Sequence, residues 1–322
     1  MGILNVGHMA LTRVEVLSAS ALGEHFDRIL CLKVRCFQNY DSNVWLMPEP
    51  RVRSAFLRNM WPGLLYVSIS RPGARVRATV DHDDVIQGLV IETPVRCESD
   101  MRSDWPRAIW RSPRMLAYLP RLCWALLSDS TFNARLAAYM LIGKTLHVAY
   151  TRQFGAHIRL DDVCVDPSLQ RQGIASALLI EVTRAADAAH TPLYLQTSSP
   201  SNVRYYRRFG FAPVCCASAC RITGSDVRVE PVTDINGFYD RLGELQRERV
   251  VTVAMARPVS AETAAALQGG QQVTVDLAAL HQFFLAKKRA ASELSLARVG
   301  VAGLLLGGML LACRASIWRS AA

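Results

Sequence analysis

Six residues at positions 170–175 have the types and the spacing to hold a phosphate group. They read Gln-Arg-Gln-Gly-Ile-Ala, between an apolar run at 163–165 and an apolar segment that starts at Ile174. Such a turn brings backbone N–H groups to the start of a helix, where the helix dipole adds partial positive charge. Gly173 and Ala175 are small enough to let a ligand approach the backbone. The pattern predicts either a phosphate site or an ordinary strand-to-helix turn with a surface arginine.

A second stretch with chemical potential lies one helix and one strand further along the chain. Residues 202–211 read Asn-Val-Arg-Tyr-Tyr-Arg-Arg-Phe-Gly-Phe. Tyr205 and Tyr206 within it are phenols, whose pKa of about 10 keeps them protonated at neutral pH.

Together the two stretches resemble the signatures of the GNAT superfamily of acetyl-CoA-dependent N-acetyltransferases. The first is similar to the family's Q/R-x-x-G-x-G/A sequence, and the Val-Asp-Pro at 165–167 is also typical of the family. The second is similar to the segment N-V-x-F-Y-E-R-x-G-F, which follows the fifth strand in the family. The resemblance covers residues 13–258 and is strong only from 157 to 211.

This resemblance implies how the donor would be held. It implies acetyl-CoA as the co-substrate, with no metal, and a pyrophosphate held at the turn by Gln170, Arg171, Gln172, Gly173, Ile174, Ala175 and Ser176. It further implies that the backbone of Val163, Cys164 and Val165 pairs with the pantetheine arm like an added strand. Asn202 would line the same groove.

The resemblance also places a general acid at Tyr206, four residues before Gly210, where its phenol would protonate the leaving thiolate, whose conjugate acid has a pKa of about 8.5. The alternative is that Tyr206 is only a packing aromatic beside Tyr205. The base is less defined, because Arg159 stands where the family often has a glutamate on the central strand. Alternation along that strand predicts one common face for His157, Arg159, Asp161, Val163 and Val165. Asp161 or His157 could take the amine proton directly or through water, or each could be structural.

The elements that must position these residues follow from periodicity and turn signals. Strands are expected at residues 14–17, 64–69, 75–80, 85–95, 157–165, 193–197, 211–216 and 250–255. Helices are expected at 19–37, at 56–61 with Pro62-Gly63 closing it, at 173–190, and at 201–208 with Ser201 as its cap. One crossover helix between strands 157–165 and 193–197 favours an α/β fold with a mixed central sheet flanked by helices, as in the GNAT fold.

Two regions are expected to differ from this regular pattern. Residues 104–154 form a helical region rich in Trp, Tyr and Met, a composition more typical of core than of a pocket, so no acceptor ligand is assigned there. Residues 218–240 are polar and turn-rich and form an insertion before the last strand.

Composition limits the possible partners and compartment. The net charge of +10 suits an anionic cofactor, and no basic run interleaved with aromatics indicates nucleic-acid binding. The 9 cysteines are scattered without paired CxxC spacing or a zinc pattern, and no secretory signal is present at the N-terminus. These features predict reduced thiols and a catalytic domain that faces the cytosol.

The remaining chain is expected to lie outside the GNAT-like domain at 13–258. Residues 259–298 read as a linker and an amphipathic helix, and 299–318 as a hydrophobic tail. The uncharged part of this tail, at 299–313, reads VGVAGLLLGGMLLAC. As a helix it would be about 22 Å long, which is shorter than the hydrocarbon core of a bilayer, about 30 Å thick. Because it lacks a polar face, a membrane anchor is favoured over a helix packed on the domain. The predicted location is membrane-anchored, and otherwise cytoplasmic.

The sequence therefore predicts an N-acetyltransferase that moves an acetyl group from acetyl-CoA to an amine acceptor, either a small molecule or a protein. The alternative is a non-catalytic GNAT-fold module that binds CoA or a partner and works as a membrane-tethered adaptor. The missing glutamate motivates this alternative.

Overall fold

The structure is a computed structural model that describes residues 13–97, 100, 112–224, 226–232 and 234–258. The chain divides into two units, residues 1–273 and 274–322, and every described residue belongs to the first. The predicted linker and amphipathic helix at 259–298 and the hydrophobic tail at 299–318 lie outside the described residues. In the described ranges, no helix combines the length and the hydropathy needed to cross a membrane.

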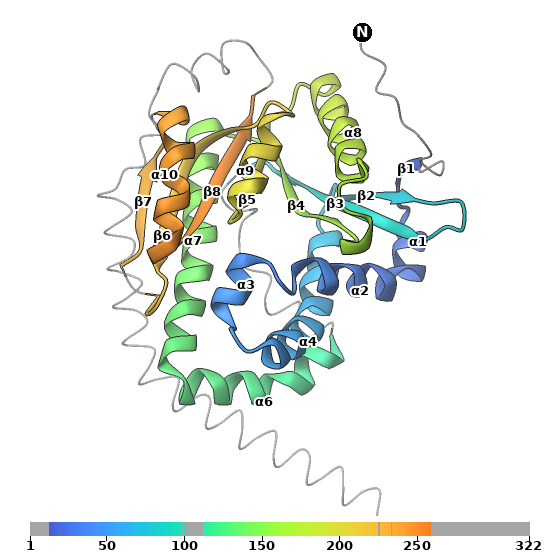
Figure 1. The fold of residues 1–322 in the computed structure, drawn as a ribbon. Helices are drawn as coiled ribbons and strands as arrows, with labels where there is room; N and C mark the ends of the chain where they lie inside the picture. Colours follow the sequence, from blue (N-terminus) through green and yellow to red (C-terminus); the bar gives the residue numbers. More distant parts are fainter. Residues whose placement is uncertain (1–12, 98–99, 101–111, 225, 233, 259–322) are drawn as a thin grey trace, which may run out of the picture. The chain divides into compact units, whose positions relative to one another are not determined.

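A single eight-stranded sheet forms the centre of the described domain (Figure 1). The strands are β1 Arg13–Val16, β2 Arg75–Val80, β3 Ile86–Val95, β4 His157–Val165, β5 Leu193–Thr197, β6 Ala212–Cys220, β7 Arg228–Pro231 and β8 Arg249–Arg257. Their order across the sheet is β1-β2-β3-β4-β5-β8-β6-β7. Only β4 and β5 are parallel among these neighbours. The predicted mixed α/β sheet is confirmed.

Helices pack on both faces of this sheet (Figure 1). They are α1 Ala19–Glu24, α2 Phe26–Phe37, α3 Asp41–Leu46, α4 Pro50–Ile69, α6 Pro113–Ser128, α7 Ser130–Phe154, α8 Ile174–Ala188, α9 Pro200–Arg207 and α10 Ile235–Glu248. Side chains of α8, α9 and α10 form one core cluster with the sheet, and those of α1, α2 and α4 form another. Neighbouring residues of β3 divide between the clusters, since Val90 joins the first and Leu89 the second. The two clusters thus lie on opposite faces.

The prediction for residues 56–69 was wrong. A short helix closed by Pro62-Gly63 and a following strand were expected, but α4 continues through both residues to Ile69. Leu57, Met60 and Leu65 are at most 1% exposed along this helix. Proline inside a helix costs about 3 kcal/mol, and burial of an apolar helix face offsets a cost of this size. Tertiary packing therefore overrides the local turn signal.

Smaller differences concern element ends. The helix expected at 19–37 is divided at His25 into α1 and α2. Ser199 is the N-cap of α9 in place of Ser201, and Pro200 takes the first helical position, where its missing N–H is not needed. The polar stretch 218–240 contains the end of β6, all of β7 and the start of α10.

Regular alternation also fails in β4, at Asp162. The pairing with β3 shifts there, with Cys164 opposite Leu89 but Asp161 opposite Ile91, and Asp162 has a left-handed φ of 55°. One extra residue in a strand forms a β-bulge and reverses the facing of everything after it. Val163 accordingly packs with the α8 cluster, whereas Cys164 packs with the α2 cluster. The predicted common face is therefore wrong from Val163 onward.

Candidate functional site

The turn between β4 and α8 concentrates backbone donors. A 3₁₀ turn at Pro167–Leu169 leads out of β4, and Arg171 and Gly173 then adopt left-handed φ values of 66° and 86°. Gly173 is the N-cap of α8 and provides no side chain to cap the first turn. Turns with left-handed residues gather N–H groups into anion-binding concavities, and a helix N-terminus adds its dipole. The exposed side chains of Gln170, Arg171 and Gln172 surround this donor group.

Close packing holds the first turn of α8 against the sheet and against α9. A Cβ on Gly88 of β3 would meet Ile174 Cγ2 and the Cys164 carbonyl oxygen, each at 3.0 Å. Glycine at position 88 therefore permits the helix start to lie directly on β3 and β4. Ser176 Oγ lies 3.0 Å from Tyr205 Oη and links α8 to α9.

The parallel strands β4 and β5 pair only at their first residues. Their ladder consists of Ile158 opposite Leu193 and Arg159 opposite Tyr194, while β4 stays paired with β3 through Val165. The β5-facing backbone of residues 160–165, here called the free edge of β4, has no partner strand in the described part of the chain. An edge of this kind can accept an extended ligand as an added strand.

Two cysteines stand beside this free edge. Cys36 of α2 donates to the Val165 carbonyl oxygen at 3.0 Å, and a side-chain hydrogen bond with Cys36, together with burial, raises the pKa of Cys164. The Cys164 thiol is therefore neutral at physiological pH, and a nucleophilic role requires the thiolate. The groups that this segment can offer to a ligand are therefore its backbone hydrogen-bond donors and acceptors, and not the thiol.

Tyr206 lies in the core cluster that contains Leu160 of β4 and Leu195 of β5. The residue is 7% exposed, and its hydroxyl makes no hydrogen bond with any described residue. Burial raises its pKa above the ordinary value, so the phenol holds its proton across the physiological range. Asn202, half-buried in the first turn of α9, likewise makes no side-chain hydrogen bond with the described chain. Both polar groups are available to a ligand.

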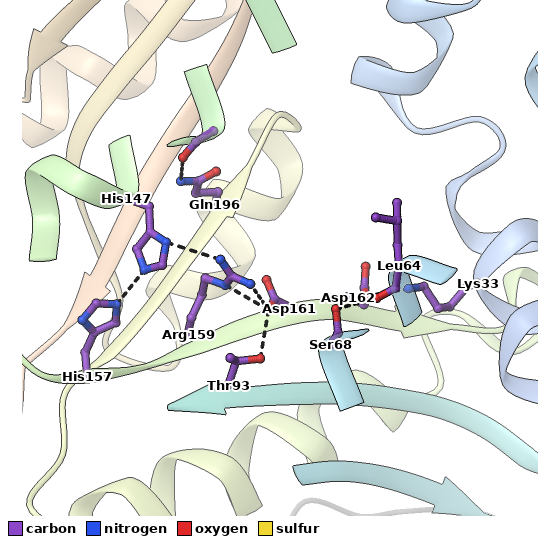
Figure 2. A network of polar contacts seen from close by, with 11 residues as sticks. Lys33, Leu64, Ser68, Thr93, His147, His157, Arg159, Asp161, Asp162 and Gln196 are labelled. Carbon is purple, nitrogen blue, oxygen red and sulfur yellow. Dashed lines mark hydrogen bonds and ion pairs between the residues drawn. The ribbon is translucent and has the colours of Figure 1, made fainter. Parts of the chain in front are cut away.

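His157 belongs to a chain of hydrogen-bonded side chains, here called the polar chain, that also contains His147, Arg159 and Asp161 (Figure 2). None of these side chains is part of the core cluster that contains Tyr206. His157 Nδ1 lies 2.9 Å from the Gly155 carbonyl oxygen, its Nε2 lies 3.0 Å from His147 Nε2, and Arg159 Nη1 lies 3.3 Å from His147 Nδ1. Since a carbonyl only accepts, His157 donates from Nδ1, accepts from His147 at Nε2, and leaves His147 Nδ1 to accept from Arg159. Both rings are then neutral and both nitrogens of His157 are engaged.

The surroundings favour that neutral state. Burial and then the nearby Arg159 and His157 lower the pKa of His147 to about 2, and burial is the main cause of the lowered pKa of His157. Tyr194 stacks on the His147 ring with centroids 5.0 Å apart. We therefore interpret His157 as a structural member of this chain.

Asp161 and Asp162 present two carboxylates on one face because of the bulge (Figure 2). Asp161 Oδ2 accepts from Arg159 at 2.6 and 2.9 Å and from Thr93 at 3.1 Å, and Asp162 Oδ2 accepts from Lys33 at 2.6 Å. Both side chains are 25% exposed, and within the described ranges neither Oδ1 has a hydrogen-bond partner. Each carboxylate is held at one oxygen and open at the other.

Several of these residues carry no signal in the sequence. His147, Lys33 and Asp162 act through partners on other elements, and Lys33 and Asp162 are 129 positions apart. Tyr40 also joins the site, since its hydroxyl lies 2.9 Å from Thr197 Oγ1 and accepts from the Ser198 N–H at 2.7 Å, at the end of β5. The predicted residues fall into two groups. The turn, the free edge, Tyr206 and Asn202 belong to β4, to the segment that follows it and to α9, while His157 and Asp161 lie in the polar chain that links β4 to α7.

Comparison with known proteins finds a family match for part of the chain. Residues 129–213, from α7 to the start of β6, match the family model described as Acetyltransferase (GNAT) domain. Similar solved structures include a histone acetyltransferase HPA2 and related acetyltransferase from Corynebacterium glutamicum (18% identity, covering 77% of this chain and 97% of that chain, TM-score 0.41). Another is arylalkylamine N-acetyltransferase 2 from Aedes aegypti (13% identity, covering 78% of this chain and 100% of that chain, TM-score 0.45). A third is the ribosomal-protein-S18-alanine N-acetyltransferase from Escherichia coli (12% identity, covering 78% of this chain and 95% of that chain, TM-score 0.38).

At these identities and TM-scores the family assignment rests on the domain match. That match includes the turn, β4, α8, β5 and α9, which are the elements that carry the two motifs. It confirms the predicted family resemblance and the prediction of an acetyl-transferring enzyme. Residues 129–213 of this chain are therefore similar to the GNAT acetyltransferase domain.

Proposed function

We propose that this protein transfers an acetyl group from acetyl-CoA to the nitrogen of an amine acceptor. The observation that carries the proposal is the placement of an anion-binding turn at the end of a strand whose β5-facing edge is free. Both features lie inside the matched family domain.

In the proposed complex, the turn at residues 170–176 holds the pyrophosphate through backbone N–H groups, with Arg171 adding charge. The pantetheine arm lies along the free edge of β4 and bonds to the backbone of residues 163–165 as an added strand. Asn202, which has no partner among the described residues, bonds to the same arm. The thioester then lies toward the bulge.

The reaction requires two proton movements. The amine nitrogen attacks the thioester carbonyl carbon, the C–S bond breaks, and the products are an N-acetylated amine and CoA. Tyr206, which its raised pKa keeps protonated, gives its proton to the leaving thiolate. Asp161 takes the amine proton, directly or through water, at its open Oδ1. His157, with both ring nitrogens bonded, orients the chain that holds Arg159 against Asp161.

Incubation of the full-length protein with labelled acetyl-CoA and a panel of amines and N-terminal peptides tests this activity. We expect release of free CoA thiol that depends on the acceptor, with label appearing in the acetylated amine. Thiol release at the same rate with and without every amine would indicate hydrolysis and contradict transfer.

A glycine substitution tests the turn itself. We expect Gly173→Ala to weaken acetyl-CoA binding about tenfold, because a left-handed φ costs an L-residue about 1–2 kcal/mol and shifts the N–H groups of the turn. Gly243→Ala in α10 is the matched control, since a Cβ there meets nothing within 4 Å. Equal affinities for the two variants, measured by titration calorimetry, would remove the turn from the binding site.

Arg159 in place of an acidic residue favours a second candidate, a non-catalytic module that binds CoA. This protein would bind acetyl-CoA with the same dependence on Gly173 but would transfer no label to any amine. The two candidates therefore differ in the transfer assay and agree in the binding assay.

We also propose that the tail at 299–318 anchors the protein in a membrane, with the catalytic domain in the cytosol. The uncharged run at 299–313 supports this proposal. We expect the tagged protein to stay in the membrane pellet after carbonate extraction, and Leu305→Arg to release it, because an arginine at a membrane centre costs about 3 kcal/mol. Ile222→Arg, at a side chain that is 75% exposed, is the matched control. Release of the unmodified protein would favour a packed helix.

A further inference from the structure

A lysine is buried beside the bulge of β4. Lys33 of α2 is 3% exposed, and its Nζ lies 2.6 Å from Asp162 Oδ2 and 5.0 Å from the centre of the Trp61 ring. A buried ammonium is costly unless it is paired, and removing its partner leaves an uncompensated charge. The contact therefore couples the position of Asp162 to that of α2.

Asp162 is the residue whose backbone makes the bulge. Its φ of 55° is unfavourable for a side chain other than glycine, although aspartate tolerates this region better than most. A left-handed residue here reverses the facing of Val163 and Cys164 and so determines which backbone groups the free edge presents. An interaction that holds Asp162 in this conformation also holds the edge.

The same helix contacts the far end of that segment. Cys36 Sγ donates to the Val165 carbonyl oxygen at 3.0 Å, and Arg35 pairs with Asp166 at 2.5 Å. Asp166 in turn caps the 3₁₀ turn that leads to the anion-binding residues by accepting from the Ser168 N–H at 3.0 Å. Three side chains from the second half of α2 thus contact both ends of residues 162–166.

We propose that Lys33 is a positioning residue for the donor, whose ion pair with Asp162 holds the β4 bulge so that residues 163–165 present their backbone to the pantetheine arm. This inference rests on the proposed function, because it assumes that acetyl-CoA lies along this edge. Lys33 touches neither donor nor acceptor; it acts through Asp162.

Lys33→Met tests the proposal, since methionine retains an unbranched apolar stem but lacks the charge. We expect the Kd for acetyl-CoA to rise about 10- to 100-fold, the scale of losses that follow small displacements of a site by distant residues. Lys144→Met, at the exposed lysine of α7, is the matched control and is expected to bind as the unmodified protein does. Calorimetry gives the Kd values, and thermal unfolding shows whether each variant is folded.

A second variant separates positioning from simple loss of stability. Lys33→Met combined with Asp162→Gly removes both charges and supplies a residue that adopts a left-handed φ without a partner. We expect it to recover most of the affinity lost in Lys33→Met. A double variant that binds as weakly as the single one, or a folded Lys33→Met protein with unchanged Kd, would overturn the inference. Failure of the unmodified protein to bind acetyl-CoA would instead overturn the proposed function.

Discussion

Replacing Tyr206 with phenylalanine is expected to lower kcat by about 100- to 10,000-fold, the range that general acid catalysis contributes. The affinity for acetyl-CoA should change little, because the ring stays in the core cluster with Leu160 and Leu195 and only the hydroxyl is lost. That hydroxyl has no partner in the described part of the chain, so its removal leaves no protein group unpaired. The loss should therefore fall on the step in which thiolate leaves.

Tyr118→Phe is the matched control, since it removes a hydroxyl from the half-buried ring of α6 that packs on Phe56. Steady-state kinetics should show normal kcat for this control. Burial raises the pKa of Tyr206, so the acid stays protonated as the pH rises, and loss of activity through this group should begin only above pH 10, its ordinary pKa being about 10. Unchanged kcat in Tyr206→Phe would remove this residue as the acid.

Acidification from pH 6.5 to pH 4.5 is expected to destabilise the protein through the buried histidine pair. The pKa of His147 is lowered to about 2 and that of His157 is also lowered, chiefly by burial, whereas both titrate near about 6.5 in the unfolded chain. The unfolded state then binds protons that the folded pair does not. Stability from the pair is present above about pH 6.5 and falls below it. His147 alone accounts for a loss of about 1.4 kcal/mol per pH unit, and His157 adds to this loss down to its own lowered pKa.

Urea unfolding at several pH values measures this slope. Replacement of both His147 and His157 by glutamine should flatten it between pH 4.5 and 6.5, because an amide does not titrate. His82→Gln, at an exposed side chain in the β2–β3 turn, should leave the slope unchanged. A flat profile in the unmodified protein would show that the pair accepts protons while folded. Carboxylates with lowered pKa values, such as Asp166 and Asp187, add their own losses below about pH 4.

The parts of the site that could be predicted are those defined by local chain order. The strand, the turn with Gly173 and the crossover helix are contiguous, so their residue types are sufficient to predict a β–α–β unit with a tight turn at the start of the helix. Tyr206 and Asn202 follow on the next helix at a fixed spacing. In these segments local preference and tertiary structure agree.

The parts that could not be predicted depend on distant contacts. Pro62 reads as a turn, but the buried face of α4 keeps the helix intact. Asp162 reads as one more residue of an alternating strand, and its left-handed conformation is tied to Lys33, which lies 129 positions away. His157 reads as a possible base, but His147 of α7 occupies its Nε2. None of these three features can be predicted without knowing which residues pack against Pro62, Asp162 and His157.

Titration calorimetry of the full-length protein with acetyl-CoA tests the central claim most directly. Saturable binding of one acetyl-CoA per chain is expected at tens of micromolar or below, in the lower half of the range of about 1 μM to 1 mM in which enzyme KM values fall. Binding should weaken in Gly173→Ala and stay unchanged in Gly243→Ala. Absence of any binding at tens of micromolar acetyl-CoA would contradict the account of the turn and the free edge of β4 as a donor site.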